Sequence, residues 1–205
     1  MTFLNKVHWA LAPDRCALLL HDLQPHYLAG VAGRDRVIVN AGSIARQCVS
    51  HGVPVFASQV PGARETRERG LLCEMWGRGP APASAALDPE LALADHEVRL
   101  LPKRSYSAFY GSDLDVMLRR LGRDSLIIAG VYTSIGCYLS AADAFMRDIR
   151  PFIVSDASAD FDQADHAAGL ATAARTCARI VTTAQVSECL GDAARRPRSH
   201  RIDVC

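Results

Sequence analysis

The sequence lacks the features that mark several large classes of protein. No apolar run approaches the roughly 20 residues of a membrane-spanning helix, and the N-terminal stretch MTFLNKVHWALAPDR lacks the basic and then apolar segments of a signal peptide. Neither sign of charge prevails, because 23 Lys and Arg stand against 22 Asp and Glu, giving a formal net charge of +1. Without a basic field, neither a nucleic acid nor a membrane is an expected partner. We therefore predict a cytoplasmic protein.

The cysteines lack the spacing of a disulfide framework or a structural zinc site. They form no C-x-x-C pair and no cluster with histidine, although seven are present, at positions 16, 48, 73, 137, 177, 189 and 205. Reduced thiols are therefore expected. One of them is still a candidate nucleophile.

The pattern of apolar residues predicts a single domain over residues 1–205, of the three-layer α/β/α class. Short apolar stretches predict strands at 16–22, 53–58, 97–101, 125–131, 152–155 and 179–183. Spacings of three or four predict helices at 37–50, 112–121, 137–150 and 163–177. This alternation indicates a mostly parallel, Rossmann-like central sheet with helices on both faces. Residues 59–86 lack a pattern and predict a long functional loop, and the basic stretch 193–205 predicts a flexible tail.

Polar residues that end the predicted strands are the first candidates for a site, because ligands bind at the carboxyl ends of strands in open parallel sheets. Asp22 follows the apolar run 17–20 and the intervening His21. Burial favours the protonated form of a carboxyl group, which would make Asp22 a general acid; capping a loop or helix is the alternative. Lys103 either faces solvent or enters the same pocket, where it would bind a carboxylate and orient Asp22. Its charge would oppose protonation of Asp22 until an anionic substrate offset it.

The segment Gly130 to Cys137, GVYTSIGC, joins the fourth strand to a helix. Backbone N–H groups at such a helix start favour an anion, whether a carboxylate or a developing oxyanion. Gly136 also fits a tight turn that requires close packing. The Cys137 thiol is either a thiolate that the helix end activates or, as is commoner, a buried and inert side chain.

Six motifs together make the chain resemble the isochorismatase-like hydrolase superfamily over roughly residues 10–185. They are ALLLHDLQ (17–24), HGVPVFAS with the following PG (51–62), ERGLLCEMWG (68–77), KRSYSAF (103–109), GRDSLIIAGVYTSIGC (122–137) and DAFMRDIRPFIVSDASADF (143–161). The last three are most similar to the isochorismatase branch. That branch includes enzymes of phenazine pathways and domains of siderophore synthesis.

A single position separates the two chemistries of this superfamily. In its cysteine hydrolases, such as nicotinamidases, a nucleophilic Cys stands six residues after the glycine that matches Gly130. This chain has Gly136 there, and Cys137 comes one position later. A shift of one residue on a helix rotates a side chain by about 100°, so Cys137 is expected to point away from the pocket. The alternatives are an amidase that uses Cys137 and a catalytically inactive binding homologue.

The resemblance implies hydrolysis of an enolpyruvyl ether, that of isochorismate or 2-amino-2-deoxyisochorismate, in secondary metabolite or antibiotic biosynthesis. Asp22 would protonate the methylene carbon as the general acid, and Lys103 would hold the aspartate and a carboxylate of this small anionic substrate, with no cofactor. A homodimer is also implied. The substrate-binding residues would be Gln59, Arg69, Trp76, Tyr132 and Gly136.

Three positions depart from the family's pattern and bear on which ring substituents are accepted. Val60 stands where glutamine usually precedes Pro-Gly, His26 begins a pair that is usually Tyr-Phe, and Arg78 replaces a proline. Metal-dependent nicotinamidases supply an Asp and two His near the long loop. Because residues 59–86 contain no histidine, no metal is predicted.

Overall fold

Six parallel strands form the centre of the molecule in the computed structural model, which describes residues 3–62, 66–82 and 85–195. They are β1 (Cys16–His21), β2 (Val55–Gln59), β3 (Arg99–Pro102), β4 (Ser125–Val131), β5 (Arg150–Ala159) and β6 (Arg179–Val181). Their order across the sheet is β3-β2-β1-β4-β5-β6, and every neighbouring pair is parallel. The order reverses between β1 and β4, and this switch point is where an open α/β sheet places its ligands.

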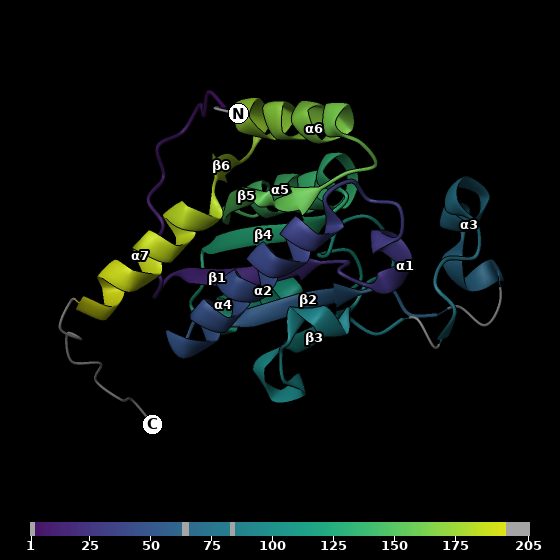
Figure 1. The fold of residues 1–205 in the computed structure, drawn as a ribbon, viewed down its shortest axis with the longest axis horizontal. Coiled ribbons are helices and arrows are strands. Elements are labelled where there is room, and N and C mark those ends of the chain that lie inside the picture. Colours follow the sequence, from purple (N-terminus) through teal and green to yellow (C-terminus); the bar gives the residue numbers. More distant parts are fainter. Residues whose placement is uncertain (1–2, 63–65, 83–84, 196–205) are drawn as a thin grey trace.

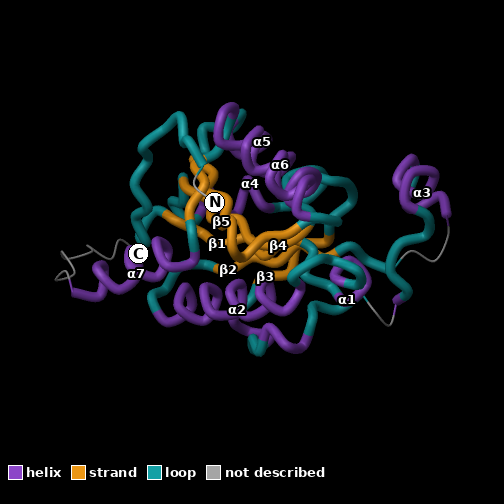
Figure 2. The backbone as a smooth tube through the Cα atoms, turned by 45° about the horizontal axis from the view of Figure 1, so that its top comes forward, coloured by secondary structure: helices purple, strands orange, loops and turns teal. Residues whose placement is uncertain are grey.

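Helices cover both faces of the sheet, which confirms the predicted three-layer α/β/α class (Figure 2). On one face pack α2 (Arg34–Ser50) and α7 (Thr183–Arg195), and on the other α4 (Leu114–Arg120), α5 (Tyr138–Phe145) and α6 (Gln163–Thr176). The remaining helical segments are short. They are α1 (Pro25–Leu28), α3 (Leu71–Trp76), the 3₁₀ turns η1 (Thr66–Arg69), η3 (Pro89–Leu91) and η4 (Asp95–Glu97), and the π-helical η5 (Thr133–Cys137).

The apolar run of β1 follows from this layering. All six of its residues are buried. Leu18 and Leu20 face the core under α2, whereas Leu19 faces the core under α5 and α6. Since successive side chains of a strand point to opposite faces, only a strand covered on both sides needs apolar residues at every position. Each of these leucines contributes about 2 kcal/mol through its burial.

Three predicted segments have different bounds in the structure. The helix predicted at 137–150 is divided between η5 and α5 and ends at Phe145, and β5 begins at Arg150 and is longer than predicted. Residues 193–195 of the tail predicted at 193–205 instead close α7, whose Val186 and Leu190 are buried in the core. The rest of the predicted tail lies outside the described residues.

The long loop after β2 carries α3, which stands away from the rest of the molecule (Figure 1). We call residues 66–79, which include η1 and α3, the arm. Three of the four large apolar side chains on α3 are exposed, those of Leu71, Met75 and Trp76. Among the described residues, α3 included, no helix is both long enough and apolar enough to cross a membrane.

Candidate active site

A pocket of about 380 Å³ lies at the carboxyl ends of β1 to β4, beside the switch point of the sheet. The arm contributes Arg69, Leu72 and Trp76 to its wall. Six of the seven residues predicted for the site line this pocket, and Gln59 does not. The six are Asp22, Arg69, Trp76, Lys103, Tyr132 and Gly136.

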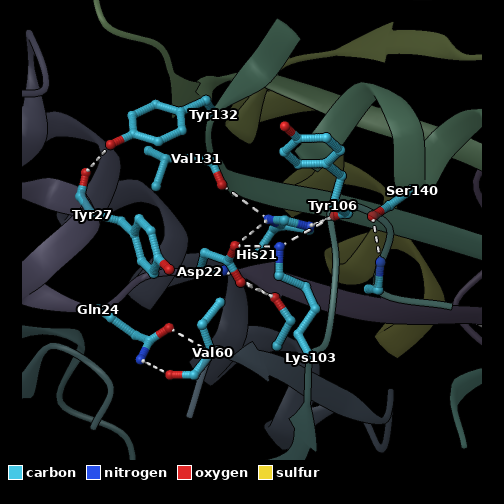
Figure 3. A network of polar contacts seen from close by, with 12 residues as sticks. His21, Asp22, Gln24, Tyr27, Val60, Lys103, Tyr106, Val131, Tyr132 and Ser140 are labelled. Carbon is cyan, nitrogen blue, oxygen red and sulfur yellow. Dashed lines mark hydrogen bonds and ion pairs between the residues drawn. The ribbon is translucent and has the colours of Figure 1, made fainter. Parts of the chain in front are cut away.

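Asp22 and Lys103 form a buried ion pair at the base of the pocket (Figure 3). Lys103 Nζ lies 2.5 Å from Asp22 Oδ2, and Ser58 Oγ donates a hydrogen bond of 2.6 Å to Asp22 Oδ1. The side chain of Lys103 is only 5% exposed and that of Asp22 only 9%. Lys103 Nζ also donates to the carbonyl of Tyr106 at 3.2 Å. Both oxygens of the Asp22 carboxylate therefore accept a hydrogen bond. Removing either Asp22 or Lys103 would leave the other charge uncompensated in a desolvated place.

His21 lies behind this pair and is neutral near pH 7. Burial lowers its pKa to about 4, and the nearby ammonium of Lys103 lowers it further against the opposing effect of Asp22. A neutral imidazole has one N–H. The carbonyl of Val131 is 2.9 Å from Nδ1 and that of Tyr106 is 3.3 Å from Nε2, so the shorter contact places the hydrogen on Nδ1 (Figure 3).

The imidazole of His21 explains why residue 136 is a glycine. A Cβ at Gly136 would overlap the His21 ring and would lie 2.9 Å from both ring nitrogens, which is closer than real Cβ contacts. The resemblance implied that Gly136 belongs to the substrate-binding residues. Gly136 does line the pocket, but the space left by its missing side chain is occupied by His21.

Arg69 brings a second cation to the pocket from the arm. Its guanidinium lies against the backbone at Gly79, where φ is +74° and an added Cβ would overlap it. Its Nη1 donates a long hydrogen bond of 3.5 Å to the hydroxyl of Tyr27. Its Nε is buried and has no hydrogen-bond partner within the described part of the chain. A buried donor without a partner is costly, so Arg69 is suited to an anionic ligand.

Stacked aromatic rings connect the arm to the switch point. Phe161 stacks on Trp76 with ring centroids 5.9 Å apart and on Tyr132 at 4.0 Å. Trp76 Nε1 donates to the hydroxyl of Tyr106 at 2.8 Å, and the Tyr132 hydroxyl donates to the carbonyl of Tyr27 at 3.0 Å. Burial raises the pKa of Tyr132 to about 12, so this hydroxyl stays a donor across the physiological range.

Gln59 is the predicted site residue that does not line this pocket. Its side-chain amide donates to the carbonyl of Ala85 at 2.5 Å, and Val60 lines the pocket in its place. Neighbouring residues of an extended chain face opposite ways. Because Gln59 stands one position before Val60, the pocket receives the apolar side chain of Val60 and not the amide of Gln59. The amide of Gln24 is occupied too, since it pairs with both backbone groups of Val60 (Figure 3). Arg78, the residue of the arm that departs from the family's pattern, is exposed and does not line the pocket.

Cys137 is fully buried and does not line the pocket. Burial raises the pKa of its thiol well above the usual range, which disfavours the thiolate that a nucleophile requires. In the described ranges, no three His, Cys, Asp or Glu side chains are grouped as ligands of a metal ion.

Sequence reasoning missed three residues that shape this site: His21, Ser58 and Phe161. His21 and Ser58 are polar residues at the ends of β1 and β2. The rule that selected Asp22, which looks for polar residues where strands end, could therefore have identified them. No local signal marks Phe161, because its role depends on stacking between the arm and Tyr132.

Comparison with known proteins adds independent information. The sequence matches the model of the isochorismatase domain over residues 16–185. It is 41% identical over 188 residues to phenazine biosynthesis protein PhzD1 of Pseudomonas aeruginosa, over 90% of each chain. It is 39% identical over 188 residues to enterobactin synthase component B of Escherichia coli, over 89% of this chain and 66% of that one.

Solved structures share the architecture at lower identity. A cysteine hydrolase from Pseudomonas syringae superposes with a TM-score of 0.80, over 91% of this chain and 97% of the other, at 23% sequence identity. An isochorismatase family protein from Burkholderia thailandensis gives 0.76 at 22% identity, over 88% and 97% of the two chains. These likenesses establish the fold alone.

Proposed function

This chain belongs to the isochorismatase family of hydrolases, and on that premise we propose that it cleaves the enolpyruvyl ether of isochorismate or 2-amino-2-deoxyisochorismate. The observation that carries the proposal is the buried pair of Asp22 and Lys103, in a pocket whose described lining contains no cysteine. An enol ether requires a proton and a water molecule and no covalent nucleophile. A carboxyl group held in a desolvated pocket is suited to deliver that proton.

The proposed reaction begins with proton transfer from the Asp22 carboxyl group to the terminal methylene carbon, which becomes a methyl group. The oxocarbenium ion that results takes up water at the adjacent carbon, and a proton of this water returns to Asp22. The hemiketal then loses its bond to the ring oxygen, which takes the hydroxyl proton. The products are pyruvate and a dihydrodiol or dihydro amino alcohol of benzoate.

Charge in the pocket supports a dianionic substrate. Lys103 and Arg69 both line the pocket, and the buried Nε of Arg69 has no hydrogen-bond partner among the residues that the structure describes. We assign the two carboxylates of the substrate to these two cations. A substrate carboxylate beside Lys103 would share the ammonium group with Asp22.

The proposal is tested by a coupled assay for pyruvate with each of the two compounds. We expect turnover of at least one, and the ratio of their kcat/KM values identifies the substrate. Absence of pyruvate from both, at enzyme levels where a known family member is fast, would reject the proposal. Tight binding without pyruvate would instead support the inactive binding homologue.

Replacing Arg69 with Gln is expected to raise KM about 10- to 100-fold, the equivalent of one lost charge-assisted hydrogen bond, with a smaller effect on kcat. The matched control is Arg78→Gln, which changes an exposed arginine of the same arm and should leave both constants unchanged. Steady-state kinetics measure both. An unchanged KM in the Arg69 variant would remove this residue from substrate binding.

Replacing Cys137 with Ala is expected to leave pyruvate formation within about twofold of wild type, since a buried, protonated thiol takes no part in the reaction. The measurement is kcat for pyruvate, together with ammonia release from nicotinamide-like amides. Ammonia release that Cys137→Ala abolishes would favour the amidase alternative.

We also propose that the protein acts in the cytoplasm as a homodimer, in the biosynthesis of a phenazine-like antibiotic or a siderophore. The named relatives support the pathway assignment. Analytical ultracentrifugation tests the oligomeric state.

A further inference from the structure

Asp22 has a backbone conformation that costs energy. Its φ is +50°, in the left-handed region that side chains with a Cβ rarely adopt. Such a residue lies of order 1 kcal/mol or more above a relaxed conformation and persists only where its surroundings determine it. The contacts of Asp22 therefore identify what holds the acid in place.

Ser58 is the residue that contacts both the backbone and the side chain of Asp22. Its Oγ accepts the Asp22 N–H at 3.1 Å and donates to Asp22 Oδ1 at 2.6 Å. The register of the parallel strands brings them together, since Ser58 of β2 is paired with His21 of β1. A hydroxyl group is suited to this position because it can accept one hydrogen bond and donate another.

The two oxygens of Asp22 are held differently. Ser58 is fully buried and does not line the pocket, whereas Lys103 does. The oxygen bonded to Ser58 is therefore on the protein side, and Oδ2, beside Lys103, is on the substrate side.

Resting on the proposed function, we infer that Ser58 is a positioning residue, which fixes Asp22 so that Oδ2 delivers the proton to the substrate. Burial alone does not account for these two bonds. Ser158 of β5 is buried to the same extent, yet its hydroxyl has no hydrogen-bond partner among the described residues.

The test compares Ser58→Ala, Ser58→Thr and the matched control Ser158→Ala. Because a misplaced general acid loses much of its advantage, Ser58→Ala should lower kcat by about tenfold or more and change KM less than about threefold. Ser58→Thr keeps the hydroxyl and should retain most of kcat, and Ser158→Ala should match wild type. A kcat within twofold of wild type in Ser58→Ala, or equal losses in Ser58→Ala and Ser58→Thr, would overturn the inference.

A second measurement does not depend on the substrate. Hydrogen exchange of the Asp22 amide, followed by NMR, should speed up in Ser58→Ala and stay slow in Ser158→Ala, because only the first change removes the acceptor of that N–H. If wild type forms no pyruvate, the proposed function fails, while faster exchange in Ser58→Ala would still support the positioning of Asp22. Unchanged exchange would overturn it.

Discussion

Replacing Asp22 with Asn is expected to lower kcat for pyruvate formation about 10³-fold, because an amide cannot deliver a proton to carbon. The substitution keeps the size of the side chain, and its amide can still accept from Lys103 and contact Ser58. Lys103 nevertheless loses its negative partner in a buried place. We therefore also expect the free energy of unfolding to fall by about 3 kcal/mol.

The control for Asp22→Asn separates the loss of the acid from the loss of a buried ion pair. Asp88 is 3% exposed and paired with Arg34 at 2.6 Å, outside the pocket. Asp88→Asn should destabilise the fold and keep its turnover, whereas Asp22→Asn should remain folded by circular dichroism and lose turnover. Retention of more than a few per cent of the wild-type rate in Asp22→Asn would remove this residue from the mechanism.

Replacing Gly136 with Ala is expected to lower the free energy of unfolding by about 3 kcal/mol and kcat/KM about 100-fold. The new methyl group would overlap the imidazole of His21, which is fully buried and held between the carbonyls of Val131 and Tyr106. Displacement of the ring would disturb Asp22, whose Oδ2 lies 3.6 Å from His21 Nδ1. Chemical denaturation and the pyruvate assay measure the two effects.

A second substitution tests whether the clash with His21 is the cause. In His21→Ala/Gly136→Ala the methyl group enters the space of the imidazole, so the double variant should be more stable than Gly136→Ala by about 1 kcal/mol or more. Gly191 in α7 is the matched control, because a Cβ there would meet nothing within 4 Å, and Gly191→Ala should not destabilise the protein. Additive losses in the double variant would contradict the pairing of His21 with Gly136.

A prediction for a whole segment rests on more residues than a prediction for a single side chain. The strand predicted at 53–58 is present as β2, yet the pocket receives Val60 where the sequence-based prediction placed Gln59. The segment was identified from several apolar residues together, whereas the direction of the side chain at the end of the strand depends on its hydrogen-bond partner. The amide of Gln59 is bound to the carbonyl of Ala85, which belongs to the far end of the loop.

The sequence by itself determined the α/β class, most of the strands, and the edge of the sheet at which Asp22 and Lys103 meet. It did so because the periodicity of apolar residues reflects which faces of each element are covered, and this is a local property of the chain. Only the tertiary structure decided that Ser58 holds Asp22, that His21 occupies the space beside Gly136, and that Phe161 joins the arm to Tyr132. Each of these contacts joins residues far apart in the chain, and strand register and helix packing place them within reach of one another.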